Sequence, residues 1–222
     1  MAARTRVKIC GITRRDDALA AARAGADAIG FVFVARSARA IEPEAAHRIA
    51  AELPPFVTPV GLFMDPDEAL VRRTIEAWPE LVPQFHGKES AADCERFGRR
   101  YLKALGVGST GTLPGNEVLD AFAGACGFLF DSHAPGELGG TGKTFDWSAL
   151  AARGSDARTL VLAGGLHPGN VEAAVRQVRP WAVDVSSGVE SAKGIKDHAA
   201  LHAFMAAVRS ADQAIGGAVP EN

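Results

Sequence analysis

Short apolar runs alternate along this chain with longer amphipathic stretches. The runs are rich in β-branched and aromatic residues, and their shortness is typical of buried parallel strands. They predict strands at 6–10, 27–33, 58–63, 81–85, 101–105, 127–130, 159–163 and 182–186.

The stretches between these runs predict helices. Several begin with Asp, Asn or Ser followed by Pro or an acidic residue, which is a normal helix start. In the first of them, Thr13 is the expected N-cap and Gly25 the residue that ends the helix. The predicted helical ranges are 13–25, 42–53, 65–77, 89–100, 116–124, 146–153, 170–178 and 196–210.

Eight strand–helix units therefore follow one another without a linker. Strict alternation indicates a parallel sheet, and eight units most naturally close into a (β/α)8 TIM barrel. An open, doubly wound sheet is the competing architecture. We expect one barrel domain over residues 1–210 and a flexible C-terminal tail over 211–222.

Length, charge and cysteines narrow the class of protein. The 222 residues fit a barrel, and a net charge of −2 with scattered Lys and Arg disfavours a nucleic-acid partner. Cys10, Cys94 and Cys126 are odd in number and far apart, which disfavours a disulfide framework or a zinc site. The chain shows neither a secretory signal nor a membrane-spanning run. We expect a soluble, cytoplasmic protein without a membrane partner.

Two glycine-rich motifs resemble nucleotide-binding signatures without matching them. GVGSTG (106–111) follows a predicted strand, but Pro114 and Gly115 break the chain where a dinucleotide-binding helix should begin. GGTGKT (139–144) has Glu137 where a P-loop requires glycine. The second segment could still wrap a ligand, but neither motif predicts NAD or ATP binding.

The loops after the seventh and eighth strands are the best candidates for a phosphate site. Barrels commonly bind phosphate there, and glycines let backbone N–H groups approach an anion. The candidates are Gly164, Gly165, Ser187 and Gly188. Tight turns alone are the alternative explanation for these glycines.

Other polar side chains also stand at the carboxyl ends of strands. Cys10 ends the first strand and Asp131 the sixth, where a partly desolvated carboxyl group can serve as a general acid. Arg39, after the second strand, could hold a carboxylate, and His86, after the fourth, could contact an aromatic or carboxylate group. A surface arginine and a packing histidine are the alternatives.

Strand alternation adds a prediction about two further charges. If Cys10 faces the barrel interior, so does Lys8, and Asp184 shares a face with Ser186 in the neighbouring eighth strand. We expect a Lys8–Asp184 pair beneath the site that helps to lower the pKa of Cys10. Asp184 is also a candidate substrate-binding residue.

Seven segments follow one another along nearly the full chain: KICGIT (8–13), GFVF with SARAI (30–41), QFHG (84–87), FDS (130–132), GGTGKTFDW (139–147), LAGGL with its later Asn (162–170) and VDVSSGVE with GIKD (183–197). Together, and in this order, they resemble the phosphoribosylanthranilate isomerases of tryptophan biosynthesis. Two positions depart from the family pattern: Phe85 replaces the usual Leu, and Ala40 the usual aromatic residue or Val.

The resemblance implies an Amadori rearrangement without metal or cofactor. Asp131 would be the general acid that opens the furanose ring, and Cys10 the general base that removes the C2′ proton. Arg39 would hold the anthranilate carboxylate, and the last two loops the phosphate. The GGTGKT loop could close over the substrate and exclude water.

Two rival functions remain to be weighed. A bifunctional isomerase related to the histidine pathway would be expected to use aspartates on strands one and six, and Cys10 disfavours it. A non-catalytic phosphosugar-binding protein would tolerate loss of the acid or the base, yet this chain has both. The sequence leaves the oligomeric state open between a monomer and a homodimer.

Overall fold

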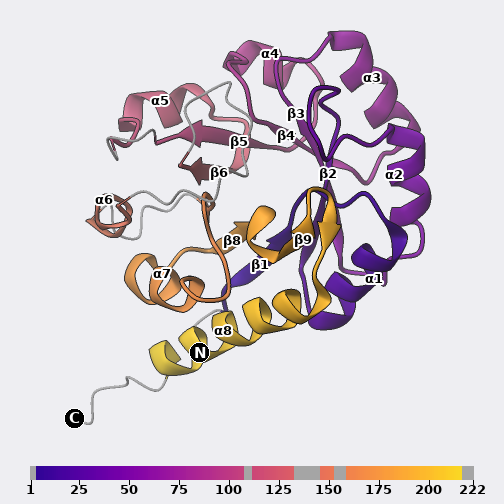
Figure 1. The fold of residues 1–222 in the computed structure, drawn as a ribbon. Coiled ribbons are helices and arrows are strands. Elements are labelled where there is room, and N and C mark those ends of the chain that lie inside the picture. Colours follow the sequence, from indigo (N-terminus) through magenta and orange to yellow (C-terminus); the bar gives the residue numbers. More distant parts are fainter. Residues whose placement is uncertain (1–3, 108–111, 133–145, 153–158, 217–222) are drawn as a thin grey trace.

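A computed structural model describes residues 4–107, 112–132, 146–152 and 159–216. Eight parallel strands form a closed barrel in chain order, as the alternating pattern predicts, and helices surround it (Figure 1). The strands are β1 Arg6–Ile9, β2 Ala28–Val32, β3 Thr58–Phe63, β4 Val82–Phe85, β5 Tyr101–Gly106, β6 Ala125–Asp131, β7 Leu160–Leu162 and β8 Ala182–Val185. The helices are α1 Arg15–Ala24, α2 Pro43–Ala50, α3 Glu68–Ala77, α4 Ala91–Glu95, α5 Asn116–Ala121, α6 Ser148–Ala152, α7 Val171–Val178 and α8 His198–Gly216.

The buried apolar side chains of the described residues form one large cluster and two smaller ones. The larger cluster packs the outer faces of the strands against the helices and includes Phe31, Phe63 and Phe204. Two smaller clusters complete the core, and the one that includes Cys10 and Leu62 lies where β1 to β3 end. Strands packed on both faces explain why the runs read as continuously apolar rather than alternating.

The first helix ends as predicted but begins differently. Gly25 takes a left-handed conformation at φ 102°, where a side chain would be strained. The expected N-cap, Thr13, is wrong: Arg14 precedes the helix without a capping side chain, and the Thr13 hydroxyl donates to the Gly194 carbonyl at 2.5 Å. The Thr13 side chain therefore contacts a distant loop instead of capping the adjacent helix.

The end of the chain holds elements that the sequence pattern does not predict. A short 3₁₀ helix, η1 (Ser187–Val189), leads into an antiparallel hairpin of β9 (Glu190–Ala192) and β10 (Ile195–Lys196). Helix α8 continues beyond residue 210 to Gly216, and Asp212 on it accepts hydrogen bonds from Thr5. The predicted boundary at residue 210, between the barrel domain and a flexible C-terminal tail, remains a prediction.

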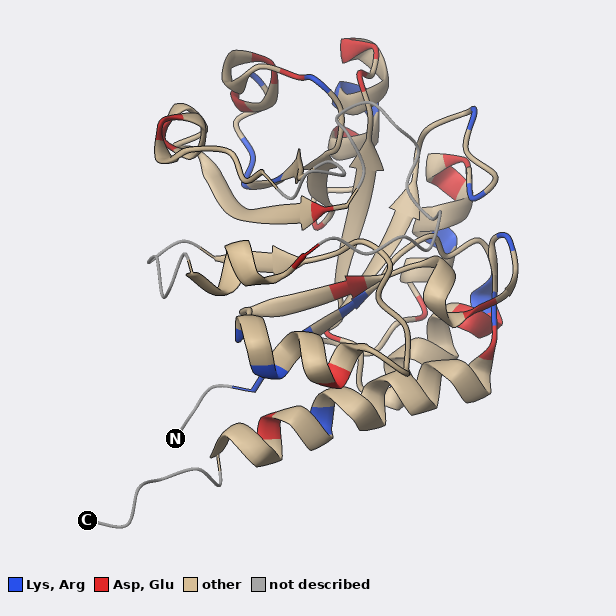
Figure 2. Ribbon diagram, turned by 60° about the vertical axis from the view of Figure 1, so that its left-hand side comes forward, with Lys and Arg blue, Asp and Glu red and all other residues tan. Residues whose placement is uncertain are grey.

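Figures 1 and 2 show α8 lying along α1 and α7. Across the described ranges, no helix combines the length and apolar character needed to cross a membrane.

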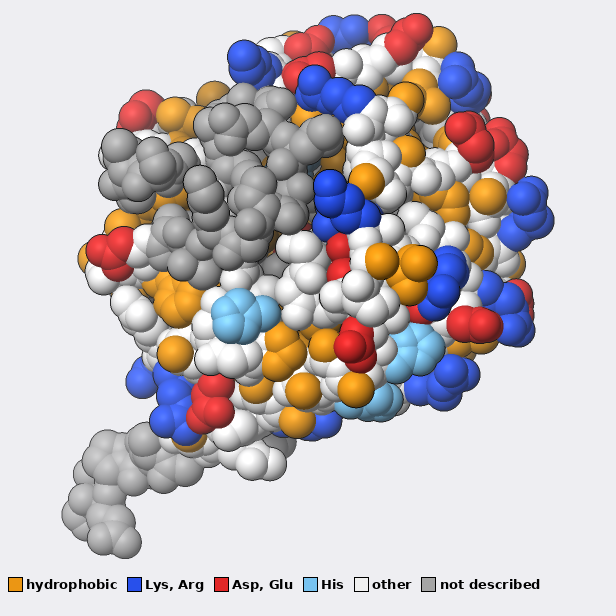
Figure 3. Space-filling model, viewed as in Figure 1, with side chains coloured by type: hydrophobic (Ala, Val, Ile, Leu, Met, Phe, Trp, Pro, Cys, Tyr) orange, Lys and Arg blue, Asp and Glu red, His pale blue; other side chains and the backbone are white. Residues whose placement is uncertain are grey.

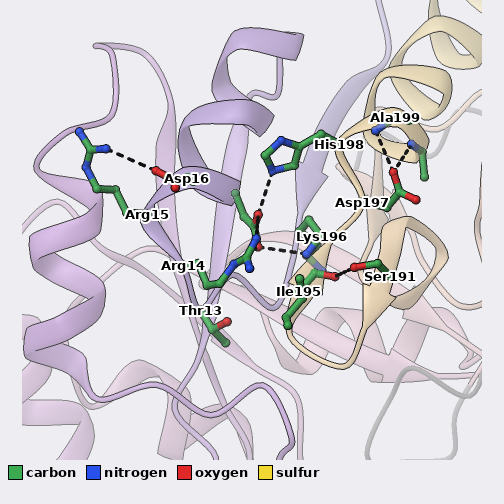
Figure 4. A network of polar contacts seen from close by, with 12 residues as sticks. Thr13, Arg14, Arg15, Asp16, Ser191, Ile195, Lys196, Asp197, His198 and Ala199 are labelled. Atoms are coloured by element: carbon green, nitrogen blue, oxygen red, sulfur yellow. Dashed lines mark hydrogen bonds and ion pairs between the residues drawn. The ribbon is translucent and has the colours of Figure 1, made fainter.

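A buried carboxylate ties the hairpin to α1. Asp17 is fully buried and accepts hydrogen bonds from the Arg14 side chain, the Lys196 backbone N–H and His198 Nε2. Figure 4 shows Arg14, Lys196 and His198 gathered around this contact from the start of α1, the end of β10 and the start of α8. Burial alone would raise the pKa of Asp17, but these contacts outweigh it and hold the pKa below its ordinary value.

Asp17→Asn is therefore expected to destabilise the fold in a pH-dependent way. A depressed folded-state pKa contributes stability above the unfolded-state pKa and loses it as the pH falls through the folded value. The variant should lose about 2 kcal/mol at neutral pH, and the difference should shrink below about pH 4. Urea unfolding at both pH values measures it. Asp16→Asn, at an exposed neighbouring carboxylate, is the control and should cost little; equal losses would contradict the prediction.

Candidate active site

A cavity opens at the carboxyl ends of the strands. It is lined by Cys10, Val32, Val34, Ser37, Arg39, Leu62, Met64, His86, Asp131, Asp184 and Ser186. The structure thus brings together the predicted catalytic pair and all three predicted substrate-binding residues. Apolar side chains from β2 and β3 form one wall, and the ionisable groups form the rest.

Cys10 lies above a buried ion pair. Lys8 Nζ is 2.9 Å from Asp184 Oδ1, and the two residues are register partners in β1 and β8. This confirms the pair predicted from strand alternation. Burial favours the neutral form of Lys8, yet Asp184 and Cys10 more than offset this and raise its pKa. Lys8 is therefore a permanent cation beneath the thiol.

Lys8 lowers the pKa of Cys10, as predicted, but burial and Asp184 raise it, and the net shift of the pKa is upward. Burial of the thiol, the largest influence, raises its pKa, and the opposing effect of Lys8 does not overcome it. The surrounding Val32, Leu62 and Met64 explain the penalty, because apolar neighbours cannot solvate a thiolate. The proton on Cys10 is consequently held more tightly than on an exposed cysteine.

Asp131 ends β6 with a nearly buried side chain beside His86. His86 Nε2 lies 3.7 Å from Asp131 Oδ2, a separation that a water molecule can bridge. The Gln84 amide lies 3.0 Å from His86 Nδ1 and fixes the ring. Burial lowers the pKa of His86 despite the attraction of Asp131, so the neutral ring is favoured. The predicted mouth position of His86 is confirmed, with the carboxyl group as its neighbour.

Arg39 is held by a residue that the sequence analysis does not single out. Its Nε and Nη2 atoms donate to the two carboxylate oxygens of Glu190 at 2.8 and 2.7 Å. The stem of Arg39 packs over Gly11: a Cβ built there would lie 2.5 Å from Arg39 Cδ, and φ at Gly11 is +75°. The glycine after Cys10 therefore makes room for Arg39.

The two predicted phosphate loops converge. Gly164 and Gly165 have φ values of 84° and 64°, which glycine alone adopts readily. Any Cβ on Gly188 would collide with the Leu166 carbonyl oxygen, so the loop after β8 packs directly against the loop after β7. Ser187 begins η1 beside this contact. The four candidates thus lie in adjoining loops at one side of the barrel mouth.

Three functional candidates escaped the sequence analysis. Glu190 and Lys196 lie on the hairpin, and their side chains form an ion pair at 2.8 Å with almost no exposure. Ser186 lines the cavity, and its buried hydroxyl has no hydrogen-bond partner among the described residues. For Glu190 and Lys196 the available signal was the segment VE…GIK, two charged residues flanking a glycine turn, and for Ser186 it was the strand face shared with Asp184.

Several other sequence features lie away from the cavity. Phe85 is buried among Phe63, Phe97 and Tyr101, and Ala40 is exposed, so neither departure from the family pattern lines the site. Cys94 is buried, and Cys126 Sγ contacts the Tyr101 carbonyl, so both lie outside the cavity. Residues 108–111 of GVGSTG and the whole of GGTGKT lie outside the described residues.

The charges on the face shown in Figure 3 are mixed in sign and dispersed, and no single-sign patch stands out on it. Within the described ranges, no group of three or more His, Cys, Asp or Glu side chains is arranged to hold a metal ion. Ionisable groups gather instead in the cavity at the barrel mouth.

The closed barrel and its ionisable cavity define a (β/α)8-barrel enzyme with its site at the carboxyl ends of the strands. A family profile described as N-(5′-phosphoribosyl)anthranilate (PRA) isomerase matches residues 7–207. The chain belongs to this family.

Individual relatives agree with the family assignment. The chain is 54% identical over 209 residues to the N-(5′-phosphoribosyl)anthranilate isomerase of Pseudomonas putida strain W619, covering 93% of this chain and 98% of that protein. It is similar to a crystal structure of dimeric phosphoribosylanthranilate isomerase from Thermotoga maritima in monomer form, with 36% identity and a TM-score of 0.77, covering 93% and 99% of the two chains. A phosphoribosylanthranilate isomerase in complex with reduced 1-(o-carboxyphenylamino)-1-deoxyribulose 5-phosphate is 38% identical, with the same TM-score and coverage.

Proposed function

We propose that Cys10 and Asp131 perform the acid–base chemistry by which this protein converts N-(5′-phosphoribosyl)anthranilate to 1-(2-carboxyphenylamino)-1-deoxyribulose 5-phosphate in tryptophan biosynthesis. The observation that carries this assignment is the placement of a thiol and a carboxyl group in one cavity. They come from β1 and β6, which are not adjacent in the barrel, so a small sugar can lie between them.

The reaction begins with ring opening. Protonated Asp131 donates its proton to the furanose ring oxygen as the C1′–O bond breaks, and the nitrogen lone pair forms the C1′=N bond of a Schiff base. The Cys10 thiolate then removes the proton from C2′. Those electrons form the C1′=C2′ bond while the π electrons of the C1′=N bond return to nitrogen, which gives an enolamine. Ketonisation gives the product. Only protons move, and no electron acceptor is needed; positioned acids and bases contribute about 10²–10⁴-fold each to such steps.

The anionic ends of the substrate anchor it across the cavity. Arg39 is assigned to the anthranilate carboxylate because a guanidinium matches a carboxylate in shape and charge. The convergent glycines of the loops after β7 and β8 are assigned to the phosphate, where backbone N–H groups can surround it. His86 and Asp184 complete the substrate-binding wall, and Asp184 also keeps Lys8 charged beneath Cys10.

A fluorescence assay tests this function. Phosphoribosylanthranilate is generated in situ from ribose 5-phosphate and anthranilate, and its disappearance is followed with the wild-type protein. Rapid consumption supports the isomerase. No turnover would reject it and would leave a phosphate-binding barrel with another substrate.

The cellular setting and the assembly belong to the same proposal. A biosynthetic enzyme with three unpaired thiols suits the reducing cytoplasm.

Of the two oligomeric states left open, we favour the homodimer. Phe56 is 98% exposed and Trp181 48% exposed, and both line a cavity at the amino-terminal end of the barrel, away from the active site. Exposed aromatic side chains beside an apolar cavity are typical of interfaces.

Phe56→Asp is expected to convert a dimer to a monomer while leaving the isomerase active. A carboxylate at this position would be desolvated if a second copy covered it. Sedimentation velocity on the wild type and the variant measures the change. His202→Asp, which adds a carboxylate to an exposed position on α8, should leave the wild-type state intact. A wild-type protein that sediments as a monomer would refute the homodimer.

A further inference from the structure

The guanidinium of Arg39 is bound along one edge only. Glu190 occupies Nε and Nη2, the edge beside the side-chain stem. Nη1 makes no hydrogen bond with the described residues, so the outer edge remains for a ligand. A guanidinium can hold two carboxylates at once in this way, one on each edge.

Glu190 is itself firmly held. Lys196 Nζ donates to its carboxylate at 2.8 Å and to the Ser186 carbonyl oxygen at 3.1 Å. The Lys196 side chain is fully buried, and Asp17 fixes the backbone of the same residue at 3.0 Å. The hairpin is thus anchored on both sides, and its carboxylate has little freedom to follow Arg39 if that side chain moves.

The charge balance favours a further anion. Arg39 and Lys196 supply two positive charges and Glu190 one negative charge, which leaves one positive charge beside the cavity. Without Glu190, Arg39 would still feel the charge of the Cys10 thiolate, and Asp184 lines the same cavity; the reaction requires both groups for other purposes. A preoriented cation avoids this competition and does not have to be ordered when the ligand binds.

We propose that Glu190, supported by Lys196, is a positioning residue that fixes Arg39 for the carboxylate of the substrate and thereby sets the preference for a carboxylated aryl group. The inference rests on the proposed function, because it assigns the anthranilate carboxylate to Arg39. Neither Glu190 nor Lys196 needs to touch the substrate.

The experiment compares two substrates that differ only in the carboxylate. Ribose 5-phosphate is condensed with anthranilate or with aniline, and kcat/KM is measured for both products. The central variant combines Glu190→Gln with Lys196→Met. It removes one negative and one positive charge, so the net charge beside the cavity is that of the wild type while the anchor of Arg39 is gone. Lys193→Met, at an exposed lysine of the same hairpin, is the control.

The double variant should lower the preference for the carboxylated substrate by roughly tenfold, chiefly by raising its KM, and should leave the aniline compound's kcat/KM nearly unchanged. Arg39→Gln should lower the preference by at least as much. Glu190→Asp retains the negative charge but moves it away from Arg39, so it should lower the preference for the carboxylated substrate by a smaller factor. This variant replaces the double variant in the test if the double variant folds poorly.

Four outcomes separate the possible failures. An unchanged preference in the double variant, with a loss in Arg39→Gln, would overturn the positioning role alone. An equal loss for both substrates would mean a purely structural role and would also overturn it. An unchanged preference in Arg39→Gln would reject the assignment of Arg39, whereas a wild type without turnover of the carboxylated compound would reject the proposed function itself.

Discussion

Asp131→Asn is expected to lower kcat by about 10²–10⁴-fold while product binding persists. The asparagine amide has nearly the same shape as the carboxyl group, so the wall of the cavity and the neighbourhood of His86 should survive the change. The amide has no acidic proton to transfer to the ring oxygen, and the alkoxide must then leave without being protonated. The fluorescence assay gives the rate, and quenching of intrinsic fluorescence by product gives the affinity.

An isotope effect distinguishes loss of the acid from general damage. Substrate made from ribose 5-phosphate deuterated at C2 carries deuterium on the carbon from which Cys10 removes the proton. In Asp131→Asn, ring opening should limit the rate, and the isotope effect should approach unity. A large primary effect in this variant would show that proton abstraction still limits the rate, and the assignment of Asp131 as the acid would fail.

Cys10→Ser is expected to lower kcat by a similar factor but to give a large deuterium isotope effect, in contrast to Asp131→Asn. A serine hydroxyl is far harder to deprotonate than a thiol, so removal of the C2′ proton should become limiting and the deuterium effect should be large. Product should still bind, since the anchors on Arg39 and the phosphate loops remain. Cys126→Ser is the matched control, and its activity should stay near that of the wild type. Equal losses in both variants would argue against a special role for Cys10.

The buried environment of Cys10 makes its reactivity depend on pH and on Lys8. Burial raises the thiol pKa, so alkylation of Cys10 by iodoacetamide should increase well into the alkaline range, followed peptide by peptide with mass spectrometry. Lys8→Met removes the cation that opposes this shift and should move the alkylation profile further toward alkaline pH. An unchanged profile would show that Lys8 does not act on the thiol.

Much of the barrel could be predicted because its strands are buried on both faces. Such strands are predominantly apolar, and this tendency marks β1 to β8 in the sequence without reference to distant residues. The Lys8–Asp184 pair followed from the same regularity, since side chains alternate along a strand and the first and eighth strands meet when a barrel closes. Glycines at the ends of β7 and β8 likewise marked loops with unusual backbone conformations.

The sequence by itself therefore determined the barrel, the loops that carry the candidate site and the side chains at its mouth. Only the tertiary structure decided how those side chains are paired. Glu190 meets Arg39 across 151 positions of the chain, and Thr13 contacts Gly194 instead of capping the nearby helix. It also decided the direction of the Cys10 pKa shift, where burial among side chains of β2 and β3 exceeds the effect of Lys8. Local sequence patterns specify the periodicity of side chains along each element and the direction in which the chain runs. Ion pairs and desolvation depend instead on which distant segments the closed barrel brings together.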